Sequence, residues 1–205
     1  MFSRATSFID RNPVTPVLLF LMIIILVAQM VFAEYSLSLF EFIFVGQNAI
    51  TPGLLLAPLS HGTIWTHFLP NVMLLLAVGW PLERYLTSSR FVLFTAVAAY
   101  LPTYLQIAYS TIMTGTAGTL GFSGAVYAFP PVLVCLAFRD GHDTNLGTAG
   151  IFALGVTIAI PLQLLGLLEL LFPSPLPEAV VTHTTGYLIG WVYGLILLSN
   201  RARRG

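Results

Sequence analysis

The sequence has no lysine and few charged residues of any kind. Charged side chains make up 8% of its 205 residues, whereas hydrophobic side chains make up 57%. Soluble domains carry about a quarter charged residues. The composition therefore excludes an ordinary soluble domain and indicates a protein that crosses a membrane several times.

Other scarce residues exclude further classes of protein. Cys135 is the only cysteine, so an intramolecular disulfide is excluded. The apolar runs contain no aspartate and almost no glutamate, which argues against a transporter or channel and against an intramembrane aspartyl protease. His61, His67 and His183 could be considered as metal ligands, but no carboxylate or cysteine completes such a site and no His-Glu-x-x-His motif is present. No cofactor and no nucleic-acid partner is expected.

The apolar runs predict an all-α membrane protein with six transmembrane helices in a single domain, residues 1–205. The predicted spans cover residues 14–33, 65–86, 91–112, 122–138, 149–172 and 180–198. The first run has about the ~20 residues needed to cross a bilayer, so an uncleaved span is favoured over a signal peptide. The apolar pieces within 34–64 are too short to cross, and we expect a long loop in the membrane interface.

The distribution of arginine favours six spans with both termini in the cytoplasm. Positive residues accumulate in cytoplasmic loops. With six spans, every arginine falls on one side, namely Arg4, Arg11, Arg84, Arg90, Arg139, Arg201, Arg203 and Arg204. A seventh span within 34–64 would place Arg4 and Arg11 on the side opposite to the other arginines. The arginine positions therefore favour six spans.

This topology brings polar residues from distant stretches to one depth. His67, Ser123 and His183 each lie near the outer end of a span, within roughly 5–10 Å of it at 1.5 Å per residue. Asn71 follows His67 by one helical turn, and Tyr127 follows Ser123 by the same spacing, so each pair shares a helix face. Polar groups are costly in lipid without partners. We therefore expect these side chains to face one another in the outer leaflet.

A stripe of small residues lies below His183. Gly186, Gly190 and Gly194 follow it at steps of three, four and four residues. Such stripes let membrane helices approach closely. His183 is thus expected on a tightly packed face, and it can reach Ser123 if the neighbouring helix is the fourth span.

These residue types suit acyl transfer, although a serine at a helix start is more often a cap. A neutral histidine can take the proton of a serine hydroxyl, and the oxyanion that develops needs donors. The first backbone N–H groups of a helix have no acceptor within the helix, so Ser123 and Gly124 could donate there. Asn71 and His67 could supply further donors, and Gly121 lets the backbone turn.

The sequence resembles the rhomboid family of intramembrane serine proteases over about residues 60–198. The residues that carry the resemblance are Gly121-Phe122-Ser123-Gly124 with Tyr127, His67-Phe68-Leu69-Pro70-Asn71 with Gly79 and Glu83, and His183-Thr184-Thr185-Gly186 with Gly190 and Gly194. Each motif alone is weak, but their order and topology together are specific.

The resemblance implies a six-helix rhomboid bundle with a Ser123–His183 dyad, Ser123 as nucleophile and His183 as general base. It implies an oxyanion hole formed by His67, Asn71 and the backbone of Ser123, with Tyr127 stacked on the catalytic histidine. Segment 34–64 matches the family's membrane-embedded first loop, and 172–178 matches the cap over the site.

The sequence departs from the family's pattern in two places. The first loop lacks the Trp-Arg pair that many members carry, so its support must come from elsewhere or the loop is looser. Pro130 and Pro131 stand where the family usually continues a regular helix, and two prolines should bend it about two turns below Ser123.

The function favoured by the sequence is a serine endopeptidase that cleaves transmembrane or juxtamembrane segments of membrane proteins. The alternative is a non-proteolytic rhomboid-like protein that binds membrane helices. The expected surroundings are the bilayer of a cell membrane, as in a prokaryotic plasma membrane, with the site on the extracytoplasmic side. The sequence does not predict the oligomeric state. Gln29 and Gln106 are expected to form hydrogen bonds between helices, and His61 is expected near the membrane surface.

Overall fold

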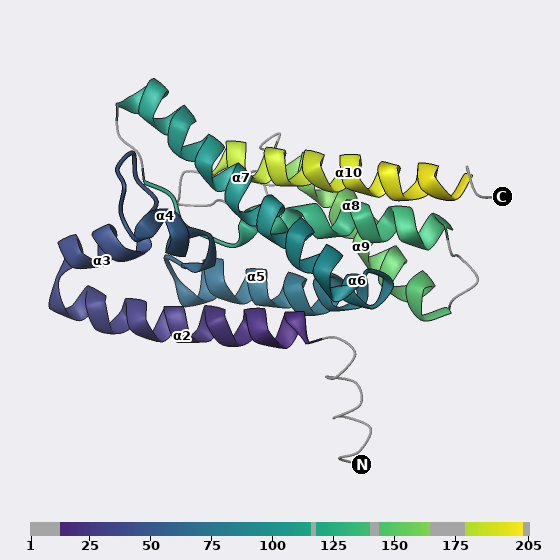
Figure 1. Ribbon diagram of the computed structural model, residues 1–205, viewed down its shortest axis with the longest axis horizontal. Helices are drawn as coiled ribbons and strands as arrows, with labels where there is room; N and C mark the ends of the chain where they lie inside the picture. Colours follow the sequence, from purple (N-terminus) through teal and green to yellow (C-terminus); the bar gives the residue numbers. More distant parts are fainter. Residues whose placement is uncertain (1–12, 116–117, 140–143, 165–178, 203–205) are drawn as a thin grey trace, which may run out of the picture.

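The computed structural model describes residues 13–115, 118–139, 144–164 and 179–202, and these ranges are almost entirely helical (Figure 1). The elements are α2 (Val14–Tyr35), α3 (Leu37–Phe44), α4 (Gly53–Leu56), η1 (Ala57–Leu59), η2 (Ile64–Phe68), α5 (Leu69–Leu74), η3 (Leu75–Gly79), α6 (Trp80–Tyr85), α7 (Ser88–Thr114), α8 (Ser123–Arg139), α9 (Thr144–Leu164) and α10 (Val180–Ala202). Segment 172–178, expected to cover the site, lies outside the described residues.

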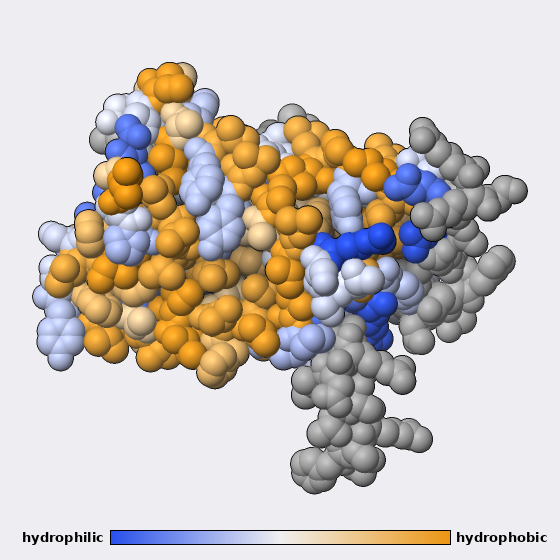
Figure 2. Space-filling view, viewed as in Figure 1, coloured by the Kyte–Doolittle hydropathy of each residue, from blue (hydrophilic) through white to orange (hydrophobic). Residues whose placement is uncertain are grey.

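Four helical stretches are long and apolar enough to cross a membrane. They are Val14–Tyr35, Ile64–Tyr85, Ser88–Thr114 and Val180–Asn200, and two shorter apolar helices cover Ser123–Arg139 and Gly147–Pro161. The four long stretches lie where the first, second, third and sixth spans were predicted. The two shorter helices overlap the predicted fourth and fifth spans without reaching the length of the others, and the predicted end of the fifth span lies outside the described residues. Large apolar side chains cover most of the surface in Figure 2. The chain is therefore a multi-pass, membrane-embedded helical protein.

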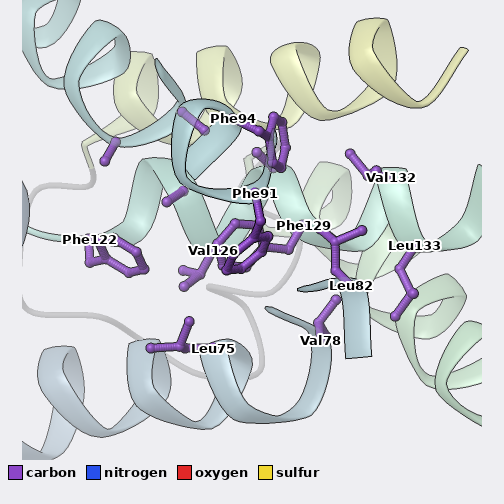
Figure 3. Close-up of a cluster of buried hydrophobic side chains, with 14 of the residues drawn as sticks. Leu75, Val78, Leu82, Phe91, Phe94, Phe122, Val126, Phe129, Val132 and Leu133 are labelled. Atoms are coloured by element: carbon purple, nitrogen blue, oxygen red, sulfur yellow. The ribbon is translucent and has the colours of Figure 1, made fainter. Parts of the chain in front are cut away.

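α8 is the most deeply buried helix of the bundle. Its residues from Ser123 to Leu136 are buried except Tyr127, which fits a helix that is apolar on all sides. The Phe129 ring contacts those of Phe91 and Phe94 from α7, with centroids 5.7 and 6.0 Å apart (Figure 3). α8 continues as one helix through both of its prolines to Arg139.

α10 packs directly against α8, and glycines make this possible. A Cβ atom added to Gly186 would collide with the carbonyl of Gly124, and one added to Gly190 would collide with the carbonyl of Ala128. At Gly194 the added atom would lie 2.8 Å from the sulfur of Cys135. The small-residue stripe thus faces α8, and Figure 1 shows the two helices side by side.

The segment between α2 and η2 is a folded loop that contains α3, α4 and η1. An isolated antiparallel bridge joins Gly46 to Thr119, with N–H to O distances of 2.8 and 3.1 Å. The hydroxyl of Tyr100 on α7 donates to the carbonyl of Leu55 at 2.8 Å. The first loop, which lacks the Trp-Arg pair, is therefore held by the chain before α8 and by Tyr100 of α7.

Glu83 attaches α6 to the start of α2. Its two carboxylate oxygens accept hydrogen bonds from the backbone N–H groups of Val14 and Thr15, each at 2.8 Å, and its side chain is buried. A carboxylate at a helix N-terminus satisfies donors that have no acceptor within the helix and interacts favourably with the helix dipole. This interaction ties the first span to the second.

Candidate active site

Ser123 is the first residue of α8 and is only 5% exposed. Gly121, two residues earlier, has a φ angle of +134°, which residues with a Cβ atom rarely adopt. The Gly121 N–H donates to the carbonyl of Ala57 at 2.8 Å. The sharp turn that starts α8 is therefore held against the first loop and aims the serine into the bundle.

His67 lies across this turn from the serine. A Cβ atom added to Gly121 would collide with the imidazole of His67, and the same position lies 3.6 Å from the Ser123 hydroxyl. The Nδ1 atom of His67 accepts a hydrogen bond from the Gly62 N–H at 3.1 Å. In a neutral imidazole the proton is then on Nε2, and Nε2 is the atom nearest Gly121. His67 thus presents a donor toward the space beside Ser123.

A π-helical turn, η2, carries His67 where the sequence predicted ordinary helix. The Phe68 N–H donates to the Thr63 carbonyl at 2.9 Å, and the Leu69 N–H donates to Ile64. These bonds span five residues, as in a π-helix. Pro70, two residues after the end of this turn, has no N–H of its own.

Asn71 lies one turn deeper, on α5, and is buried at 4% exposure. Its side-chain nitrogen donates to the carbonyl of His67 at 2.8 Å. An amide nitrogen has two hydrogens, so one remains for another acceptor. The same hydrogen bond fixes Asn71 relative to His67.

His183 on α10 stacks on the ring of Tyr127, with centroids 4.1 Å apart and planes 13° apart. Tyr127 is one helical turn from Ser123, and Gly186 brings the backbones of α10 and α8 together at Gly124. The Nδ1 atom of His183 is buried and has no hydrogen-bond partner among the described residues. The expected neighbourhood of the serine, the tyrosine and the two helices is therefore present.

Within the described part of the chain, Ser123 and His183 share no direct hydrogen bond. Catalytic hydrogen bonds are often long before substrate binds and shorten in the complex. The backbone N–H groups of Ser123 and Gly124 likewise donate to no backbone carbonyl among the residues described. Both groups lie in the first turn of α8, where donors are free.

His61 lies in the loop between η1 and η2, as the sequence predicted, and its side chain is deeply buried there. Its position near the membrane surface stays a prediction. His61 is 2% exposed, and its ring meets those of His67 and Phe68 edge-on at centroid distances of 5.3 and 5.2 Å. Burial lowers the pKa of His61 from 6.5 to about 3, and the nearby His67 adds to this effect. Its backbone N–H donates to Gln29 of α2 at 2.9 Å. A second histidine thus packs behind His67.

Gln106 forms the hydrogen bonds between helices that the sequence predicted for it, and they join α7 to the start of α10. Its side-chain oxygen accepts from the backbone N–H groups of Val181 and Thr182, at 3.2 and 3.3 Å. Its nitrogen donates to Ser110 at 2.9 Å. Gln106 of α7 therefore caps the N-terminus of α10, next to His183. The sequence marked Gln106 as polar in an apolar span but did not identify this partner.

The fold and the site define a multi-pass helical membrane protein with a buried serine at a helix start and histidines on two other helices. The family model of the rhomboid domain matches residues 49–200. The chain belongs to the rhomboid family, whose members are generally serine proteases acting on transmembrane substrates in the bilayer. Comparison with curated proteins finds no match.

Proposed function

We propose that this protein is an intramembrane serine endopeptidase that cleaves transmembrane or juxtamembrane segments of membrane proteins. The observation that carries the proposal is the position of His183. Its ring stacks on Tyr127, one turn from Ser123. The two helices meet there at Gly186, Gly190 and Gly194, where a larger side chain would collide with α8. Close helix packing alone would account for the glycines, whereas a histidine stacked on an aromatic ring one turn from a buried serine is what a serine–histidine dyad would use.

In the proposed mechanism, Ser123 Oγ attacks the scissile carbonyl carbon and its proton passes to the imidazole of His183. The tetrahedral intermediate collapses, the C–N bond breaks, and His183 returns the proton to the leaving amine. Water then attacks the acyl-enzyme while His183 takes its proton, the bond from the acyl carbon to Ser123 Oγ breaks, and His183 returns that proton to Ser123 Oγ. Tyr127, whose ring stacks on that of His183, would hold the imidazole in place during these proton transfers. No cofactor takes part.

The proposed oxyanion hole uses the donors that remain free around Gly121. They are the Nε2–H of His67, the second amide hydrogen of Asn71 and the backbone N–H of Ser123. Such donors stabilise the charge that develops on the carbonyl oxygen. Gly121 keeps this space open, since any Cβ atom there would meet the His67 ring.

We further propose six spans with both termini in the cytoplasm, in a cell membrane of the prokaryotic type. All eight basic residues then lie on the cytoplasmic side. The site opens to the extracytoplasmic side, where water can reach the acyl-enzyme. α8 and α9 would be the two shorter spans.

The alternative function is a rhomboid-like protein that binds membrane helices without cleaving them. One observation favours it: the described residues include no hydrogen bond between Ser123 and His183. This alternative predicts that replacing either residue leaves function intact.

The deciding experiment is reaction of the purified protein in detergent with a fluorophosphonate probe, which labels activated serines. We expect labelling of the parent, no labelling of Ser123→Ala or His183→Ala, and unchanged labelling of Ser89→Ala, an exposed serine on α7. Each variant should keep the thermal unfolding midpoint of the parent to within a few degrees. An unlabelled but folded parent would support the helix-binding alternative.

A further inference from the structure

An apolar groove runs along the outer side of the bundle between α7 and α10, and its end at Thr185 lies two residues from His183. Its volume is about 640 Å³. The walls are exposed apolar side chains of both helices, among them Leu93, Val97, Leu188 and Val192. We propose that this groove binds one acyl chain of an anionic phospholipid, with the lipid phosphate at Arg90.

Most of the groove is lined by apolar side chains, and one end of it is polar. Arg90 is in the first turn of α7 and Asn200 in the last turn of α10, and both line the groove. Arg90 is exposed and has no ion-pair partner in the part of the chain that the structure describes. The polar end therefore offers positive charge at the level of lipid head groups.

The dimensions of the groove suit an acyl chain. From Asn200 to Thr185 the groove follows α10 for 15 residues, which is about 22 Å at 1.5 Å per residue. One leaflet of the hydrocarbon core is about 15 Å thick, half of the ~30 Å bilayer core. An acyl chain whose phosphate lies at Arg90 can therefore remain in the groove across the whole thickness of one leaflet.

The floor of the groove is rigid. Phe94 of α7 and Tyr193 of α10 stack face to face there, with centroids 4.7 Å apart and planes 16° apart. Phe94 is also part of the buried core against Phe129. The hollow is thus a fixed feature of the packing between α7 and α10 rather than a gap between loose side chains.

The side chains around the groove favour a flexible chain over a second transmembrane helix. Helices associate in membranes through small residues that let backbones approach. The groove is lined by leucine, isoleucine, valine and aromatic residues, and the small stripe Gly186, Gly190 and Gly194 of α10 is already packed on α8. A hollow surrounded by branched side chains gains dispersion contacts when a flexible chain fills it.

The proposal is independent of the protease function, and native mass spectrometry tests it. The purified protein is titrated with phosphatidylglycerol and, separately, with phosphatidylcholine. We expect one phosphatidylglycerol to bind in preference to phosphatidylcholine. Arg90→Gln should weaken phosphatidylglycerol binding about five-fold, the size of one basic contact with an anionic lipid. The matched control Arg84→Gln, an exposed arginine of α6 outside the groove, should bind as the parent does.

Val97→Trp fills the groove from its wall and should reduce binding of both lipids, and Leu93→Trp serves the same purpose if that variant does not fold. Both positions face outward, so the core is not disturbed. Equal binding of the two lipids, equal losses in Arg90→Gln and Arg84→Gln, or unchanged binding in the tryptophan variants would each overturn the proposal. Loss of a dimer in Val97→Trp would assign the groove to a second copy of the chain instead.

Discussion

The backbone of Gly186 lies directly against the carbonyl group of Gly124, next to the residue proposed as nucleophile. The distance between α8 and α10, and with it the position of His183 relative to Ser123, is set by the absence of a side chain at this point. A methyl group is enough to separate the two helices.

Gly186→Ala should therefore lower both stability and activity. Overpacking of this kind costs about 1–3 kcal/mol, and the displacement of α10 should remove fluorophosphonate labelling. Thermal unfolding in detergent and probe labelling would measure the two effects. Gly155→Ala on α9 is the matched control, because no atom lies within 4 Å of a Cβ atom added there. Equal effects of the two substitutions would contradict the proposed role of the contact.

Gln106 is expected to position His183, the proposed general base, without touching substrate. Gln106→Leu removes the acceptor for Val181 and Thr182, and loss of a helix cap costs about 1 kcal/mol. Probe labelling should slow roughly five-fold, the rate equivalent of that energy. Gln106→Glu keeps an acceptor oxygen and should label at nearly the parent rate.

A purely structural role for Gln106 would give a different pattern. Gln106→Leu would then lower the unfolding midpoint without changing the labelling rate of the folded protein. Ser110→Ala separates the two hydrogen bonds of Gln106, because it removes only the partner of the side-chain nitrogen. We expect this variant to label as the parent does.

His61 should make the fold sensitive to acid. Its pKa is lowered to about 3 in the folded protein, whereas an unfolded histidine has a pKa near 6.5. Between these values the unfolded chain binds more protons than the folded one. The stability contributed by neutral His61 is thus fully present above pH 6.5 and falls by up to about 1.4 kcal/mol per pH unit below it.

The test compares unfolding midpoints at pH 7.5 and 5.5 for the parent and His61→Leu. We expect the decrease on acidification to be smaller in the variant, since an apolar side chain of similar size has no proton to bind. An identical decrease in both proteins would assign the acid sensitivity to other groups.

The carboxylate of Glu83 should stabilise the first span. Glu83→Ala leaves the N–H groups of Val14 and Thr15 without their acceptors, which we expect to cost about 1–3 kcal/mol in unfolding free energy. Glu41→Ala is the control, because Glu41 is an exposed acidic residue on α3. A similar midpoint for the two variants would show that the capping interaction contributes little.

Much of the fold could be predicted from hydrophobic length and residue spacing alone. A helical span needs a long apolar run, so the positions of α2, α7 and α10 follow closely from local composition. The glycine stripe predicted a close helix contact, because periodicity shows which residues share a helix face. It left the partner helix open, and the structure identifies it as α8.

Features that depend on distant partners could not be predicted in the same way. The sequence placed His61 in a loop near the membrane surface but did not show that its ring packs edge-on against that of His67. The π-helical turn at Ile64–Phe68 has no clear signal in its residues. The bridge between Gly46 and Thr119 uses backbone groups only, and side-chain patterns carry no information about such a contact.

That bridge, with the hydrogen bond from Gly121 to Ala57, links the chain just before Ser123, the proposed nucleophile, to a segment far earlier in the sequence. The start of α8 takes its position from this segment as much as from the helices that surround α8. Insertions or deletions between α3 and η1 should therefore alter the reactivity of Ser123, although no residue of that segment is proposed to take part in the chemistry. The first loop would thus hold the candidate active site in position, and its length could not change without moving the start of α8.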